Sequence, residues 1–250
     1  MAGRPRSAFM TTVFLPARAG SERVKDKNTR PFASFPGGLL ELKLRQLDRV
    51  PGIDEVLVST NDDEVARISA ELGDELEVPV VPLARPDRYG CSSSSMQTFI
   101  QDYIASLDLS GTVLWTHVTH PLMTSDGYRR VLRRYDEVSA SGCDSLVTTT
   151  KVQEFLWKNG KPFNYDPVPE RWPRTQDLAP LRLINHAAYV IDFSTLVSIG
   201  DRVGLRPDLF DITTTEAFDI DWQEDFDLAE EIVSFRRGVT ATERTARPVL

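Results

Sequence analysis

The chain is poor in the residues that build metal clusters and disulfide frameworks. Its 250 residues include only two cysteines, Cys91 and Cys143, and only three histidines. Two isolated cysteines give neither the paired spacing of a zinc site nor a disulfide network, so we expect reduced thiols and a cytoplasmic protein. No apolar run approaches the roughly 20 residues that cross a bilayer, so we expect no membrane-spanning helix.

Positive charge is also scarce. Lysine and arginine together number 29 against 37 acidic residues, which gives a net charge of −8. A general nucleic-acid binder needs a basic footprint, so this class is excluded. Hydrophobic residues at 41% and charged residues at 26% are ordinary for a globular protein. We expect one domain over residues 11–237, a disordered tail over 1–10 and a loose C-terminal tail over 238–250.

Apolar segments alternate with helical patterns along this domain. Strands are predicted at 12–15, 54–60, 78–83, 112–118, 144–150 and 183–192. Helices are predicted at 39–50, 61–72, 96–104, 127–140 and 222–235. Such alternation is typical of βαβ units and indicates an α/β fold with a mainly parallel sheet.

Residues 151–183 interrupt this order. The stretch holds five prolines and five aromatic residues, which makes it too irregular for the main sheet and too aromatic for disorder. We therefore predict an excursion that packs on a partner subunit or covers the site.

The basic loop after the first strand is the most informative segment. Four of the chain's few cations lie within ten positions, namely Arg18, Arg23, Lys25 and Lys27. Between them are small residues that let the backbone approach a ligand, namely Ala17, Ala19, Gly20 and Ser21, and Gly20 can take a positive φ. Backbone N–H groups in such a turn form an anion-binding concavity, and the cations beside it neutralise phosphates. The loop therefore predicts a polyphosphate site.

The same loop resembles the nucleotide-binding motif of the CMP-sialic acid synthetases (acylneuraminate cytidylyltransferases), Pro-Ala-Arg-Gly-Gly-Ser-Lys-Arg followed by Lys-Asn. The matching residues are Pro16, Ala17, Arg18, Gly20, Ser21, Arg23, Lys27 and Asn28. Ala19 replaces a glycine, which is a mild change if φ is negative there. Glu22 replaces a lysine and removes a positive charge, so Arg23, Lys25 or Lys27 has to carry more of the phosphate load.

The resemblance spans roughly residues 11–235. Further segments match the family in the same order, at 56–66, 85–86, 144–147, 185–189 and 219–221. It implies a doubly wound, Rossmann-like cytidylyltransferase domain with a small dimerisation element, which would fall at 151–183. A homodimer, CTP as substrate and Mg²⁺ as cofactor are implied with it.

The family reaction is attack of a sugar-acid hydroxyl on the α-phosphate of CTP, with release of pyrophosphate. By resemblance, Arg18 and Lys27 act on the triphosphate as catalytic residues. The nucleotide would be held by Ala17, Gly20, Ser21, Arg23 and Asn28, with Arg85 and Ser92 on the cytosine side.

Asp219 and Asp221 are the metal candidates. Alternation in a strand would send both side chains to one face, where they reach one hard cation. The competing interpretation is a charged strand end or an N-cap of the last helix.

The acceptor side departs from the family pattern. Leu-Gln-Pro-Thr-Ser-Pro-Leu reads here as Trp-Thr-His-Val-Thr-His-Pro-Leu over 115–122, so His117 replaces Gln and His120 replaces Ser. The predicted acceptor-binding residues are His117, Thr119, His120, Asn185 and Tyr189. His117 is either a general base, a binding residue or a tolerated replacement. The family's acidic position after Arg-Pro is also lost, around Cys91.

Three functions remain open at this point. The first is CMP transfer from CTP to an acidic sugar of the nonulosonic type. The second is the same transfer to another acceptor, such as a phosphonate or another carboxylated sugar, which the histidines favour. The third is a non-catalytic nucleotide-binding homologue, against which the retained cations and paired aspartates argue. Acceptor screening separates the first two, and metal-dependent turnover excludes the third.

Overall fold

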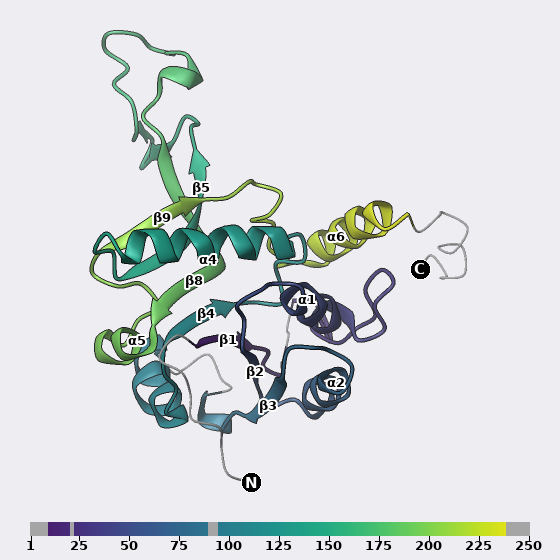
Figure 1. Ribbon diagram of the computed structural model, residues 1–250. Coiled ribbons are helices and arrows are strands. Elements are labelled where there is room, and N and C mark those ends of the chain that lie inside the picture. Colours follow the sequence, from purple (N-terminus) through teal and green to yellow (C-terminus); the bar gives the residue numbers. More distant parts are fainter. Residues whose placement is uncertain (1–9, 21–22, 90–94, 239–250) are drawn as a thin grey trace.

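The structure, a computed structural model, describes residues 10–20, 23–89 and 95–238. A seven-stranded sheet runs through the molecule (Figure 1), with the strand order β3-β2-β1-β4-β8-β5-β9. Its strands are β1 (Thr11–Pro16), β2 (Glu55–Thr60), β3 (Val80–Ala84), β4 (Thr112–Thr116), β5 (Ser145–Val152), β8 (Leu181–Asp192) and β9 (Pro207–Asp211).

Neighbouring strands are parallel except at β8, which is antiparallel to both β4 and β5. The chain moves outward from β1 through β2 to β3 and then returns to the other side of β1 at β4. In open α/β sheets, such a reversal of strand order lies beside the crevice where ligands bind. The sheet confirms the predicted doubly wound, mainly parallel α/β class.

Helices cover both faces of the sheet. One face packs against α1 (Gly38–Asp48), α2 (Asp63–Gly73), α4 (Ser125–Ser139) and α6 (Gln223–Arg236). The other face packs against α3 (Met96–Thr98), which continues as a π-helix, η2 (Phe99–Ile104), and a 3-10 turn, η3 (Ala105–Leu107), and against α5 (Phe193–Ile199). Two further 3-10 turns are η1 (Asp87–Tyr89) and η4 (Thr175–Asp177). Within the described ranges, no helix has the length and apolar content needed to cross a membrane.

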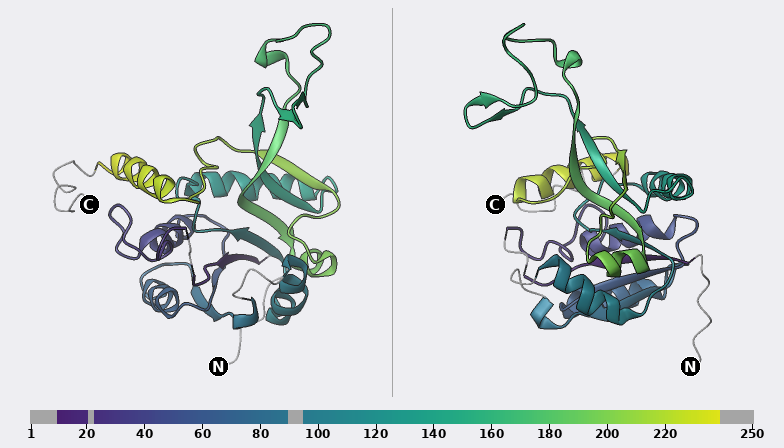
Figure 2. Two further views of the ribbon diagram at one scale, coloured as in Figure 1. Left: turned by 180° about the vertical axis from the view of Figure 1, so that it is seen from behind. Right: turned by 90° about the vertical axis from the view of Figure 1, so that its left-hand side faces the viewer.

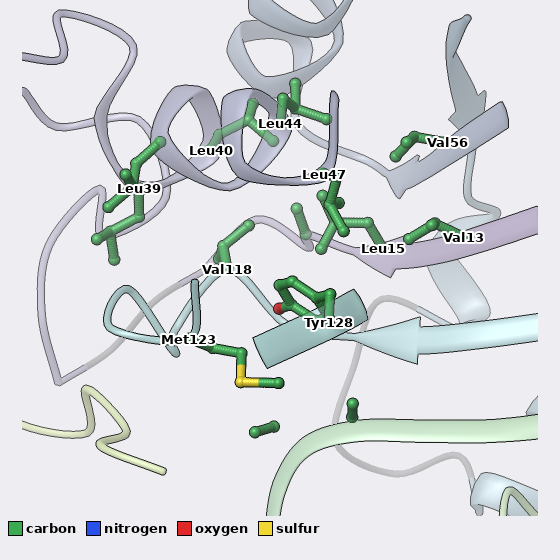
Figure 3. Close-up of a cluster of buried hydrophobic side chains, with 14 of the residues drawn as sticks. Val13, Leu15, Leu39, Leu40, Leu44, Leu47, Val56, Val118, Met123 and Tyr128 are labelled. Atoms are coloured by element: carbon green, nitrogen blue, oxygen red, sulfur yellow. The ribbon is translucent and has the colours of Figure 1, made fainter. Parts of the chain in front are cut away.

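The alternation of side chains along β1 divides the core into two clusters. Val13 and Leu15 join the cluster beneath α1, whereas Phe14 points to the opposite cluster. Figure 3 shows the α1 leucines packed over this strand, and the predicted apolar face is fully buried: Leu40, Leu44 and Leu47. Burial of such a side chain contributes roughly 1.5–3 kcal/mol, so this packing holds the end of β1 in place.

One local prediction is wrong, one is confirmed in modified form, and two elements were not predicted. Residues 219–221 form a loop rather than a strand, because the segment has a single backbone link to the β4 loop, from the N–H of Ile220 to the carbonyl of Thr119. The helix predicted at 96–104 is present, as one α-turn that continues into a π-helix. The elements that were not predicted are α5 and β9. Both give a weak pattern, because α5 is seven residues long and β9 is an edge strand that begins with a proline.

The excursion predicted at 151–183 is an arm that stands away from the sheet (Figures 1 and 2). It leaves from β5 and returns along β8, and it carries the short hairpin of β6 (Trp157–Lys158) and β7 (Lys161–Pro162). Its aromatic residues pack on one another, with the Phe155 ring 5.0 Å from Tyr165 and 5.3 Å from Trp172. Trp172 nevertheless remains 57% exposed.

Candidate active site

The loop after β1 is fixed by the end of β2. The N–H of Ala17 donates to the carbonyl of Ser59 at 3.0 Å, and the Thr60 hydroxyl donates to the carbonyl of Ala17 at 2.7 Å. The N–H of Ala19 donates to the Asn61 side-chain oxygen at 3.0 Å. These hydrogen bonds fix the backbone of the loop at its small residues. The cationic residues of the loop therefore extend from a backbone of fixed position.

Gly20 takes the left-handed conformation that the sequence predicted, with φ of +82°. A Cβ at this position would meet nothing within 4 Å, so glycine is needed here for its backbone angle and not for space. Ala19 has no positive φ. The replacement of the family's glycine by Ala19 is therefore mild, as expected.

A cavity of about 260 Å³ opens between this loop and the loop that follows β4. The cationic lining consists of Arg18, Arg23 and Lys27. Across from them the cavity is lined by residues 117–119. The structure thus brings His117, which is distant in sequence, to one cavity with Arg18 and Lys27 of the basic loop.

Lys27 and Asn28 are held by contacts on both sides of the loop. Lys27 Nζ donates to the carbonyl of Ile220 at 2.7 Å, and the Asn28 amide donates to the carbonyl of Arg18 at 3.2 Å. Partial burial lowers the pKa of Lys27, although the carboxylates of Asp219 and Asp221 oppose that shift. Lys27 therefore joins the basic loop to the segment that bears the two aspartates.

A second cavity, of about 270 Å³, adjoins the first and shares Pro16, Arg18 and His117 with it. Its remaining walls are more apolar and include Arg85 and Phe99, together with Tyr89, Ser95, Met96 and Trp115. Flat aromatic walls beside a cationic cavity suit a nucleobase next to its phosphates.

Arg85 is buried and presents an unused donor to this region. Its Nε donates to the Ser59 hydroxyl at 3.1 Å, and its guanidinium lies over the Phe99 ring at 4.7 Å. Burial lowers the pKa of Arg85 to about 10, so it remains charged at neutral pH. One guanidinium nitrogen is buried without a hydrogen-bond partner among the described residues. It is therefore available to an oxygen or ring nitrogen of a ligand.

Asp219 and Asp221 lie beside the cationic loop. Asp221 forms an ion pair with Arg23, with 2.9 Å between Oδ1 and the guanidinium. Asp219 Oδ1 is buried without a hydrogen-bond partner in the part of the chain described. Asp221 does not cap the last helix, because the Asp225 carboxylate accepts the backbone N–H groups of Asp221 and Trp222. The capping interpretation is therefore wrong for Asp221.

These carboxylates fit a hard divalent cation. An orphaned buried oxygen on Asp219 and a second carboxylate two residues away are the ligands that Mg²⁺ takes from proteins. Within residues 10–20, 23–89 and 95–238, no group of three or more His, Cys, Asp or Glu side chains could hold a metal ion. A cation here would take its remaining ligands from phosphate oxygens and water.

His120 lies behind the first cavity and not in its wall. The side chain is fully buried, its Nε2 donates to the carbonyl of Asn185 at 2.7 Å, and its Nδ1 lies 3.8 Å from Asp219 Oδ1. Burial lowers the pKa of His120 to about 4, against the opposing effect of Asp219. The ring is therefore neutral, and 3.8 Å is too long for a hydrogen bond.

His117 and Tyr189 share a cationic neighbour that the sequence did not predict, Arg202. Its guanidinium lies over the Tyr189 ring at 4.3 Å and approaches His117 Nε2 at 3.4 Å. Burial, with Arg202 as the next cause, lowers the pKa of His117 well below its ordinary value. Tyr189 also bonds the His186 ring. All three histidines therefore gather behind or beside one cavity.

The side chain and the backbone carbonyl of Asn185 form hydrogen bonds within the protein. Its side-chain oxygen accepts from the Thr148 hydroxyl at 2.8 Å, and its amide donates to Thr150 at 2.9 Å. Its carbonyl accepts from His120. Asn185 thus orients its neighbours, and the structure uses both its side-chain oxygen and its amide for that purpose.

Lys43 is the other residue of this region that sequence reasoning missed. Its side chain is fully buried in α1, and Nζ donates to the carbonyl of His120 at 2.8 Å and to the Tyr128 hydroxyl at 2.7 Å. The sequence signal that could have identified Lys43 was a lysine on the predicted buried side of an amphipathic helix.

Four positions of the sequence argument, Ser21, Glu22, Cys91 and Ser92, lie outside the described residues.

Comparisons with known proteins identify the family and the fold of the chain. A family model described as cytidylyltransferase matches residues 12–245. The sequence has no match among curated proteins. The structure is similar to CMP:2-keto-3-deoxy-manno-octonic acid synthetase complexed with CTP, with a TM-score of 0.64 and 11% identity over 91% of this chain and 99% of that one.

It is also similar to 4-diphosphocytidyl-2C-methyl-D-erythritol synthase from Anaerococcus prevotii, with a TM-score of 0.62 and 13% identity over 91% of this chain and 99% of that one. At these identities the structural likeness supports the fold alone. The family model spans nearly the whole chain, and it confirms the broader part of the predicted resemblance without reaching its sialic acid branch. The chain belongs to the cytidylyltransferase family.

Proposed function

We propose that this protein transfers CMP from CTP to an acidic sugar of the nonulosonic type and releases pyrophosphate. The observation that carries the proposal is the cavity of about 260 Å³, which has Arg18, Arg23 and Lys27 on one wall and His117 on the other. A triphosphate needs several cations at one place, and this acidic protein gathers them there.

Phosphoryl-type transfer requires positioning and charge stabilisation more than covalent chemistry from the protein. Arg18 lines both cavities and would contact the triphosphate where it meets the nucleoside. Lys27 would neutralise charge that develops on the leaving pyrophosphate, because its Nζ is already fixed by the Ile220 carbonyl. The anchored backbone of Ala17 and the left-handed turn at Gly20 line the same cavity and let a phosphate approach the main chain closely.

The second cavity would hold cytosine. Arg85 offers an unpaired, buried guanidinium nitrogen there, and the oxygen and ring nitrogen of cytosine are acceptors. The Phe99 ring fixes the plane of that guanidinium. A charged donor that cannot be solvated favours a base with acceptors in matching positions.

Asp219 and Asp221 would hold the Mg²⁺ that we expect with CTP. A magnesium ion held there would neutralise negative charge on the phosphates. The ion pair between Arg23 and Asp221 is half-exposed on both sides and therefore costs little to rearrange when nucleotide enters. Arg23 is then free to turn from the carboxylate to a phosphate.

On the acceptor side, His117 is the residue that faces both cavities. Its ring is neutral because burial and Arg202 disfavour the charged form. Since Arg202 can only donate to Nε2 of this ring, Nδ1 carries the hydrogen and is left to donate to the acceptor, in the position where the family pattern has Gln. Thr119 lines the same wall, whereas Tyr189 supports it from behind.

A second acceptor class deserves a direct comparison. His117 stands where the family pattern has Gln, which changes the pattern of hydrogen-bond donors. Arg202, next to His117, adds a positive charge on the acceptor side. This favours an acceptor with a compact anion, such as a phosphonate or another carboxylated sugar. The two similar structures, a CMP:2-keto-3-deoxy-manno-octonic acid synthetase and a 4-diphosphocytidyl-2C-methyl-D-erythritol synthase, are named for different acceptors, which supports testing more than one acceptor class.

The arm supports the further proposal of a homodimer. Trp157, Phe163 and Trp172 are each more than half exposed on a segment that has left the main core. An apolar patch of this kind is typical of a protein interface. Light scattering of the purified protein should give twice the chain mass, and the substitution Trp172→Glu should shift it toward the monomer; a monomeric wild type would overturn the dimer.

The test of the main proposal is pyrophosphate release with CTP, Mg²⁺ and a panel of nonulosonic acids, carboxylated sugars and phosphonates. Calorimetry with CTP and Mg²⁺ should first show binding, and ATP should bind more weakly. Turnover with a nonulosonic acid supports the proposal, and turnover only with a phosphonate supports the second class. Tight CTP binding without turnover on any acceptor would identify a non-catalytic homologue.

A further inference from the structure

Two buried acceptor atoms face each other beside the cationic cavity. His120 Nδ1 and Asp219 Oδ1 are 3.8 Å apart, and neither has a hydrogen-bond partner within the described residues. Buried polar side-chain atoms are nearly always hydrogen-bonded, so the pair requires a group between them. His120 is fully buried, and bulk water therefore does not solvate its ring.

The hydrogen bonds of the ring identify which nitrogen carries the proton. His120 Nε2 lies 2.7 Å from the carbonyl oxygen of Asn185, which can only accept, so Nε2 carries hydrogen. In the neutral ring Nδ1 then presents a lone pair toward the Asp219 carboxylate. Two lone pairs that face each other in a buried place repel, and a bound cation removes that repulsion.

We propose that His120 Nδ1 is a nitrogen ligand of the divalent cation that Asp219 holds together with the nucleotide. The inference rests on the proposed function, and it adds an imidazole to a site of carboxylates and phosphates. Metal–ligand bonds of about 2.0–2.2 Å to each atom span a separation of this size. The family pattern has Ser at this position, so the nitrogen is a property of this chain.

The surroundings of the ring are those of a metal-binding histidine. Such histidines donate their second ring N–H to a carbonyl or carboxylate, which fixes both tautomer and orientation. Here the Asn185 carbonyl is that acceptor, and Asn185 is itself held by Thr148 and Thr150. The backbone carbonyl of His120 is held by Lys43. The lone pair of Nδ1 is therefore fixed toward Asp219.

The chemical consequence is a change in metal preference. Mg²⁺ favours oxygen ligands, whereas imidazole raises the affinity for later first-row ions. The site should therefore bind Co²⁺ more tightly than Mg²⁺ in the presence of CTP. Replacement of His120 by Ser should lower that preference by about tenfold, the low end of the losses seen when groups around a metal are removed.

Pulsed electron paramagnetic resonance tests the bond itself. The full-length protein is labelled with ¹⁵N-histidine and loaded with Mn²⁺ and CTP, and electron spin echo modulation is compared with that of unlabelled protein. A histidine ligand shifts the modulation on labelling, while nitrogens of CTP do not. With three histidines in the chain, the variants His117→Gln and His186→Gln serve as controls. We expect the histidine coupling in wild type and in both controls, and its loss in His120→Ser.

Each outcome decides the matter. Absence of histidine coupling in wild type, with Mn²⁺ and CTP bound, would show that a proton or water bridges the pair and would overturn the inference while leaving the nucleotide site intact. Loss of coupling in a control variant would assign the ligand to another histidine and would overturn it as well. If Mn²⁺ and CTP do not bind, the proposed function itself fails. Should His120→Ser not fold, the two control variants identify the ligand by elimination.

Discussion

The nucleotide side and the acceptor side of this site are built in different ways. The nucleotide side comes largely from one continuous loop, residues 16–28, which leaves Arg18 and Arg23 exposed. The acceptor side is assembled from the loop after β4, from β8 and from the loop before α6. There His120, Asn185 and Tyr189 are buried and bonded to other parts of the protein.

The two sides therefore differ in the role of their residues. Those on the nucleotide side are placed to contact a ligand, and those on the acceptor side maintain the structure of the site. The exposed cations line a cavity and have room to move onto phosphates. The buried polar groups bond mainly to the protein, and these bonds fix the positions of His117 and of His120 Nδ1, which has no partner among the described residues. We therefore expect substitutions on the nucleotide side to affect catalysis strongly, and those on the acceptor side to affect stability, metal choice or acceptor affinity.

The largest effect should come from Arg18→Ala. Arg18 lines both cavities, and removal of a preorganised charge contact should lower kcat by about 10²-fold or more. Lys25→Ala is the matched variant in the same loop, because Lys25 is exposed and lines neither of the two cavities. An exposed, screened charge should change kcat by less than about threefold. Steady-state pyrophosphate release measures both, and equal losses would contradict the assignment of Arg18.

The next effect concerns stability on the acceptor side. Burial lowers the pKa of Lys43 to about 7, from an ordinary value of 10.5. Between these two values the unfolded chain binds more protons at this position than the folded one. Stability therefore rises with pH across this window, with a contribution that approaches about 1.4 kcal/mol per pH unit.

Urea unfolding at pH 7.5 and 9.5 measures this dependence. Lys43→Met fills the same space without the charge and should remove the contribution of Lys43 from the slope. Arg45→Met is the control, because Arg45 lies on the same helix at the surface and pairs with Glu41 and Glu75. Equal slopes in wild type and Lys43→Met would show that Lys43 is not the source.

A smaller effect is expected from Arg85→Lys in the second cavity. Lysine keeps the charge but loses the planar group that lies over Phe99 and the bond to Ser59. The dissociation constant of CTP should rise by about tenfold, equivalent to about 1.4 kcal/mol. Arg88→Lys is the neighbouring control at an exposed position. Calorimetry measures the CTP affinity of both variants. An unchanged CTP affinity in Arg85→Lys would contradict the placement of cytosine in the second cavity.

The comparison also explains what the sequence could and could not predict. The basic loop was recognisable because a short motif places its own residues, and Gly20 took the predicted φ. The sheet class followed from alternating apolar segments. By contrast, Lys43 enters the acceptor side from α1 and Arg202 from the loop after α5. No local pattern connects Arg202 to His117 or Lys43 to His120.

The aspartates illustrate the same limit. Their proximity to the cationic loop was expected, and the contact of Arg23 with Asp221 agrees with it. The prediction assumed that both aspartates lie on a strand. The segment is instead a loop, with a backbone hydrogen bond from the N–H of Ile220 to the carbonyl of Thr119. The burial of His120 against Asp219 depends on that bond and on Lys43, so the order of residues alone did not reveal it.

The smallest effect, and the sharpest test of the acceptor side, should come from His117→Gln. Glutamine restores the family residue and can replace one hydrogen bond, so we expect a change of about fivefold in acceptor KM, equal to about 1 kcal/mol, with CTP affinity unchanged. The pH profile adds a second test. Because burial and Arg202 lower the pKa of His117, its ring stays neutral and wild-type kcat/KM for the acceptor should be flat between pH 6 and 8. A limb near pH 6.5 that disappears in His117→Gln would instead make His117 a titrating base.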